Sequence, residues 1–183
     1  MRTVALVRLH GDRSDETKKE CTMTDVAPVS VSRRIPARPR EIFAILADPN
    51  RHLEIDGSGM LRGAIDPVPV SGVGDVFAMK MYHEEFGDYE MNNTVVEYQP
   101  DGLIGWEPAR RDIDAEPWHY RWRYELVPEE DGATVVTESF DLSHSPEEAR
   151  QATKDGTVWT EAMTESLERL ERLCSPRETP HGR

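Results

Sequence analysis

The sequence is short of cysteine and of long apolar runs, the features of secreted and membrane proteins. Its two cysteines, Cys21 and Cys174, lie towards opposite ends of the chain. They form no disulfide framework and indicate a reducing compartment, so we expect the cytoplasm. No stretch approaches the roughly 18 uninterrupted apolar residues of a membrane span. The first apolar run is broken by Arg8 and lacks a small-residue cleavage site, which argues against a signal peptide.

Positive charge is also scarce. The chain has 22 lysines and arginines against 35 aspartates and glutamates, a formal net charge of -13. A field of that sign repels phosphate backbones and anionic lipid surfaces at long range. We therefore expect no nucleic-acid partner.

Signatures of several catalytic and cofactor sites are missing. The chain has no Gly-x-Ser-x-Gly elbow, no His-Glu-x-x-His and no phosphate loop, and the pair Gly72 and Gly74 is too short for a dinucleotide fingerprint. Its six histidines show no metal-ligand spacing. An acidic run of Asp112, Asp114 and Glu116 offers oxygen ligands for a hard cation, but solvated charges on a loop are the commoner pattern. We predict no metal and no cofactor.

What remains is the composition of one globular domain. A chain of 183 residues can bury a core without metals or disulfides. We expect that domain over residues 27–174, with a disordered leader (1–26) and a disordered tail (175–183). Both a monomer and a homodimer are compatible with the sequence.

The first elements are a strand and a short helix. Residues 29–35 alternate weakly and are rich in β-branched residues, which predicts a strand. Pro39 suits a first helical turn, and Glu41 complements the helix dipole there. This helix should stop before Asp48 and Pro49. Residues 49–59 indicate a second irregular helical turn or a loop.

From residue 60 the apolar period changes to two, which indicates antiparallel strands. An Asp-Gly pair within residues 128–132 marks a hairpin, so the last two strands should be neighbours. The six candidates are residues 60–65, 75–83, 89–98, 103–106, 118–127 and 133–142.

The chain returns to helical spacing near its end. Ser145, Pro146 and Glu147 form a helix start, with an N-cap hydroxyl followed by proline and carboxylates. From there to residue 173 the pattern predicts one helix of about 40 Å. Gly156 lies in its middle, where we expect a bend or a close approach.

Five segments carry a family resemblance: VSRRIPARPREIFAILADPNRH (31–52), GVGDVFAM (72–79), NNTVVEYQPDGLIGW (92–106), WRYELVPEEDGATVVTESFDLS (122–143) and LERLERL (167–173). With the order of elements over residues 29–173, they resemble the START-like (SRPBCC) superfamily, and within it the bacterial polyketide cyclase/dehydrase and lipid-transport-like group. The resemblance implies an α+β helix-grip fold: a curved seven-stranded antiparallel sheet around a long C-terminal helix, with two short helices between strands 1 and 2. It also implies a cavity between sheet and helix.

The segment WHYRWRYEL (118–126) shows what such a cavity could be lined with. Its aromatic residues share one face by period two, while His119, Arg121, Arg123 and Glu125 should face solvent. Methionines and aromatic rings suit a bulky apolar ligand, although such residues also fill ordinary cores. The expected inward set is Phe77, Met79, Met81, His83, Met91, Asn93, Trp106, Trp122, Tyr124, Trp159 and Met163.

Polar groups within that set need a reason to be buried. His83 and Asn93 could recognise a ligand, or lie at strand ends and pair with backbone. Glu138 would join them if it shares the face of Val136 and Phe140, but the opposite parity is almost as plausible. With Tyr124, these are the candidates for proton transfer in an enzyme.

Three functions are compatible with this pattern. The leading hypothesis is a binding module that carries a hydrophobic small molecule, namely a polyketide, a lipid or an aromatic metabolite. The second is a cyclase, aromatase or dehydratase that works largely by positioning a reactive chain, without metal or nucleotide. The third is an interaction protein related to chaperone activators, which would use the acidic surface.

Overall fold

A computed structural model describes residues 27–85, 87–111 and 117–175. The leader 1–26 and most of the tail, whose disorder we predicted, lie outside these residues. The elements, in chain order, are β1 (Val29–Ile35), α1 (Pro39–Leu46), the 3-10 turn η1 (Pro49–Arg51), α2 (His52–Ile55), β2 (Leu61–Ile65), β3 (Val76–His83), β4 (Gly87–Gln99), β5 (Leu103–Arg110), β6 (Arg121–Pro128), β7 (Thr134–Asp141), α3 (Glu147–Ala152), the 3-10 turn η2 (Thr157–Trp159) and α4 (Thr160–Cys174).

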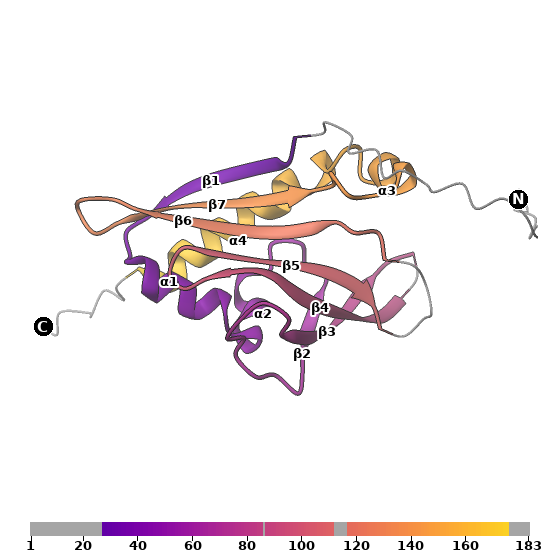
Figure 1. The fold of residues 1–183 in the computed structure, drawn as a ribbon, viewed down its shortest axis with the longest axis horizontal. Coiled ribbons are helices and arrows are strands. Elements are labelled where there is room, and N and C mark those ends of the chain that lie inside the picture. Colours follow the sequence, from indigo (N-terminus) through magenta and orange to yellow (C-terminus); the bar gives the residue numbers. More distant parts are fainter. Residues whose placement is uncertain (1–26, 86, 112–116, 176–183) are drawn as a thin grey trace, which may run out of the picture.

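The strands form one antiparallel sheet in the order β1-β7-β6-β5-β4-β3-β2. Pairing of β1 with β7 brings the first strand beside the last. Helix α4 crosses one face of the sheet, with α1 and α2 near its C-terminal end and α3 at the opposite end (Figure 1). The predicted α+β helix-grip architecture is confirmed, including the two short helices between the first two strands.

Helix α1 begins and ends where the sequence predicts. Pro39 occupies its first turn, and the Glu41 carboxylate accepts a hydrogen bond from the Arg38 backbone N–H at 3.0 Å. This partner satisfies one N–H group at the helix start. The helix stops before Asp48, whose carboxylate accepts from the Asn50 N–H at 3.0 Å and begins η1.

The predicted continuous helix over residues 145–173 is wrong. Helix α3 ends in a turn where Lys154, Asp155 and Gly156 have φ values of 49°, 54° and 86°. These left-handed conformations end a helix. A Cβ at Gly156 would lie 2.9 Å from Cδ1 of Phe140, so the expected close approach is present. It coincides with a break between two helices rather than a bend.

The start of α3 also differs from the prediction. The N-cap is Pro146, and no side chain caps the helix. The Ser145 hydroxyl is instead buried, with no partner among the described residues. Its position before a proline resembled a cap, but its side chain faces the interior.

Two strands differ from their predicted bounds by three or more residues at one end. β5 continues past Trp106 through Pro108 to Arg110, although β6 pairs with it only over residues 103–106. Beyond that point, among the described residues, β5 has a strand on one side only, where a missing proline N–H is tolerated. β6 begins late, at Arg121, because His119 has a φ of 52°.

Candidate functional site

A cavity of about 620 Å³ lies between the sheet and α4. Its walls come from β3 to β7, from α2 and from α4. All eleven residues predicted to face inward line it, and Glu138 does too. For the nine of these residues that lie on strands, the predicted alternation agrees with the observed side of the sheet. Whether they bind a ligand stays a prediction.

Two groups of aromatic rings form a wall of the cavity. Trp106 on β5 stacks on Tyr124 of β6 with ring centroids 5.8 Å apart. Trp122 is the next inward residue of β6. Its ring centroid lies 4.6 Å from that of Phe140 and 5.7 Å from that of Trp159. Rings at these distances attract one another and are held rigid, so the wall presents flat apolar surfaces to the space beside it.

The opposite face of β6 is polar, as predicted. Arg121 donates to Glu107 at 2.8 Å, and Arg123 donates to Glu125 at 2.9 Å. Both guanidinium groups also lie within 4 Å of Glu97. This network keeps charge on the outer face of the strand that carries the aromatic wall.

Glu138 is the buried carboxyl group of the cavity. It lies opposite Tyr124 in the β6–β7 ladder and is 4% exposed. Burial raises its pKa to about 8, although the hydrogen bond from the Tyr124 hydroxyl opposes the rise. Its Oε2 has no hydrogen-bond partner in the described part of the chain. The register left open by the sequence thus places Glu138 inward, on the face of Val136 and Phe140.

Tyr124 completes a polar pair on this rung of the sheet. Burial raises the pKa of its hydroxyl well above the ordinary value, and the neighbouring Glu138 charge raises it further. The hydroxyl therefore keeps its proton. It can donate to Glu138 while its oxygen accepts from another group.

Trp159 brings a second unsatisfied polar atom to the cavity. It ends η2, directly before α4, and its Nε1 is buried without a partner among the residues described. An indole N–H only donates. This atom needs an acceptor that the described protein groups do not supply.

Asn93 and His83 occupy different settings. Asn93 is buried, and its Nδ2 donates to the Phe77 carbonyl at 3.3 Å. His83 lies at the end of β3, half-buried, where its Nδ1 accepts from the Glu85 backbone N–H at 3.2 Å. Asn93 is therefore part of the inner lining, and His83 lies at the rim of the cavity.

His52, at the start of α2, is a lining residue that the sequence analysis missed. Its ring stacks on Trp106 at 5.4 Å and meets Phe77 edge-on at 5.2 Å. Nε2 lies 2.8 Å from the Leu46 carbonyl, which can only accept, so this nitrogen carries the hydrogen and Nδ1 is the acceptor. Burial lowers its pKa, which favours the neutral ring. It adds a neutral acceptor to the lining.

The rim of the cavity lies where the β3–β4 hairpin, the end of β5 and the segment before β6 meet. Trp118 is 40% exposed there, and Glu85 is exposed as well. The Arg110 guanidinium lies 4.8 Å from the centre of the Tyr89 ring. Charged groups therefore surround the entrance, whereas the inner walls are mostly apolar.

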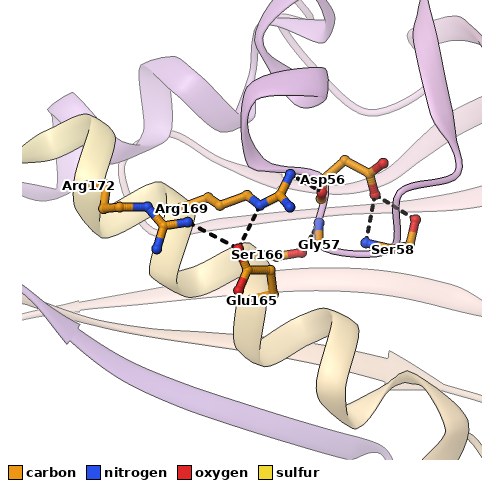
Figure 2. Close-up of polar contacts among 7 residues, drawn as sticks. All are labelled: Asp56, Gly57, Ser58, Glu165, Ser166, Arg169 and Arg172. Carbon is orange, nitrogen blue, oxygen red and sulfur yellow. Dashed lines mark hydrogen bonds and ion pairs between the residues drawn. The ribbon is translucent and has the colours of Figure 1, made fainter.

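Hydrogen bonds join the segment after α2 to α4 (Figure 2). Arg169 donates to the Asp56 carbonyl at 2.7 Å and to Glu165 at 2.8 Å. The Gly57 N–H donates to the Ser166 hydroxyl at 3.1 Å. Asp56 and Ser166 also line the cavity, so these bonds fix one of its walls.

No group of three or more histidines, cysteines or carboxylates in the described residues is placed to hold a metal ion. The acidic run of Asp112, Asp114 and Glu116 lies outside the described residues. None of the described helices has the length and apolar character needed to cross a membrane.

A cavity between a seven-stranded sheet and a C-terminal helix is a framework shared with known proteins. Residues 27–175 match the family model described as polyketide cyclase / dehydrase and lipid transport. The chain belongs to this family. The resemblance drawn from the sequence is thereby confirmed.

The chain is also similar to individual proteins of known sequence or structure. The chain is 38% identical over 123 residues to uncharacterized protein Rv0088 of Mycobacterium tuberculosis, covering 66% of this chain and 50% of that one. It spans about half the length of the curated relatives it matches. Protein CV1439 of Chromobacterium violaceum superposes with a TM-score of 0.61 at 17% identity, over 81% of this chain and 97% of the other. Protein Ms6760 of Mycobacterium smegmatis superposes with a TM-score of 0.61 at 18% identity, over 81% of this chain and 91% of the other. These low identities show the fold alone.

Proposed function

We propose that the protein binds and carries a largely apolar small molecule, such as a polyketide, a lipid or an aromatic metabolite, between the sheet and α4. The observation that carries this proposal is the cavity of about 620 Å³, walled by aromatic rings and methionines. Ligand pockets typically measure about 300 to 1,000 Å³ and are mostly apolar with a few placed polar groups. The family description, which names lipid transport, supports the same class of ligand.

Native mass spectrometry of the purified protein tests this proposal. A bound apolar compound of constant mass supports either carriage of that compound or its conversion by a cyclase or dehydratase. An empty chain that instead captures other proteins supports the interaction role suggested by the net charge of -13.

Replacing Met91 by tryptophan should weaken binding of that compound by about tenfold or more. Met91 is buried on β4 and faces the cavity, so a larger ring there occupies space that the ligand needs. Titration calorimetry of wild type and variant measures the change. Tyr82→Trp is the matched control, because Tyr82 is 37% exposed on the other face of β3. Equal weakening by both variants would contradict the proposed location.

A specific observation favours a second function, a cyclase or dehydratase. Glu138 has a pKa of about 8, so it holds a proton at neutral pH, and one of its oxygens has no partner among the described residues. A buried acid of this kind can donate a proton to a carbonyl group of a folded chain. Positioning by the rigid aromatic wall would supply the rest of the rate.

His83→Ala separates carriage from catalysis at the rim. Affinity for a carried ligand should stay within about twofold, because His83 lies at the rim rather than among the inner walls. If its imidazole moves protons, turnover of the co-purifying compound should fall about a hundredfold or more. Single-turnover product analysis measures this. An unchanged rate would end the proposed proton-carrier role of His83.

A further inference from the structure

Glu138 and Trp159 line the same cavity, and each has a buried polar atom, Oε2 and Nε1 respectively, without a partner among the described residues. Leaving such groups unsatisfied is costly, and in native proteins each calls for a partner. One is a carboxyl oxygen and the other a pure donor, so together they complement a group that accepts from both, or that accepts and donates.

Their positions on the sheet are related. Glu138 pairs with Tyr124, and the next inward rung of the same two strands pairs Phe140 with Trp122. Trp159 lies over that second rung, with its ring 5.7 Å from Trp122 and 6.1 Å from Phe140. A polar rung therefore adjoins an aromatic one, and a ligand ring over the second would bring its substituents near the first.

The charges along the cavity disfavour an anion at this place. Asp56 lines the cavity, and its charge contributes to the raised pKa of Glu138. The cationic Arg110 lies at the rim, over the Tyr89 ring. A fatty-acid head held at Arg110 would direct its tail towards the inner walls and leave Glu138 Oε2 unsatisfied.

We propose that Glu138 and Trp159 form a polar subsite for the uncharged keto or hydroxy groups of a ring-containing apolar ligand. The proposal rests on the proposed binding function and assigns the class of ligand. A carbonyl accepts from the indole N–H and from the protonated carboxyl group, and a hydroxyl accepts from one and donates to the other. A hydrocarbon can make neither bond, and a carboxylate brings a negative charge into a cavity that Asp56 also lines.

Three probes of matched shape test the subsite: 2-naphthol, 2-methylnaphthalene and 2-naphthoate, titrated by calorimetry at neutral pH. Wild type should bind 2-naphthol about ten- to a hundredfold more tightly than 2-methylnaphthalene, and 2-naphthoate more weakly than 2-naphthol. Glu138→Leu and Trp159→Phe should each reduce this preference about tenfold. They should leave the affinity for 2-methylnaphthalene nearly unchanged.

Two variants serve as controls. Glu138→Gln should retain the preference, because the amide still donates and accepts. Tyr82→Phe, a change on the other face of β3 and outside the lining, should retain it too. Trp159→Phe keeps a six-membered ring and deletes the N–H, so it carries the test if Glu138→Leu fails to fold by circular dichroism.

Equal affinities for 2-naphthol and 2-methylnaphthalene, or tightest binding of 2-naphthoate, would overturn the subsite and leave the binding function standing. Failure of all three probes to bind would contradict the binding function itself, and the subsite with it.

Discussion

Alanine at position 57 is expected to lower the free energy of unfolding by about 3 kcal/mol or more. A Cβ on Gly57 would lie 2.1 Å from the Ala162 carbonyl oxygen and 2.6 Å from the Ser166 backbone nitrogen. Both atoms belong to the backbone of α4 and cannot rotate away. The segment after α2 must then move off the helix, which breaks the Gly57 to Ser166 and Arg169 to Asp56 hydrogen bonds together (Figure 2).

Urea unfolding followed by tryptophan fluorescence measures this loss. Gly72→Ala is the matched control, because a Cβ there meets nothing within 4 Å, and it should change stability by less than about 1 kcal/mol. Ser166→Ala, which removes one hydrogen bond without a clash, should cost about 1 kcal/mol. If Gly57→Ala costs no more than Ser166→Ala, the close packing of this segment against α4 is refuted.

The aromatic wall could be predicted from the sequence because strand alternation is a local property. Once β3 and β4 are strands, Met79 and Met91 must face the same side as their second neighbours. The same logic did not decide the side of Glu138, because Thr137, Ser139 and Asp141 made the other parity almost as plausible. Its side was set by pairing with Tyr124 across the ladder, which is a tertiary property.

His52 was missed for a related reason. It belongs to a four-residue helix, too short to show a periodic pattern. What makes it a lining residue is its contact with Phe77 and Trp106, which come from distant strands. No local signal in residues 49–59 marks that contact.

The break between α3 and α4 had a signal that the apolar stripe obscured. Asp155 and Gly156 form an Asp-Gly pair, the kind of sequence that ends helices and makes turns. The apolar spacing on both sides suggested one helix instead. The break matters for the site, because it places η2 and the Trp159 indole over the cavity.

Glu138→Gln should remove a stability loss that the wild type shows as the pH rises from about 5 to 8. The ordinary pKa of 4.5 applies to the unfolded chain, and burial raises the folded value to about 8. Between these values the folded state binds more protons than the unfolded state, so the free energy of unfolding falls with increasing pH. The full loss is on the order of 4 kcal/mol. Tyr124 and Asp56 are the titratable groups whose effect on Glu138 enters this value.

The glutamine variant keeps a polar side chain of the same shape but cannot ionise. Its stability should therefore resemble that of wild type near pH 5 and exceed it near pH 8, as measured by urea unfolding at several pH values. Glu130→Gln, in the exposed β6–β7 hairpin, should leave the wild-type profile unchanged and so controls for net charge. Parallel profiles for wild type and Glu138→Gln would mean that the carboxyl group is ionised within the folded protein at neutral pH. A negatively charged Glu138 could still accept a hydrogen bond from a ligand hydroxyl, but it could not donate a proton to a carbonyl, and the cyclase alternative would lose its acid.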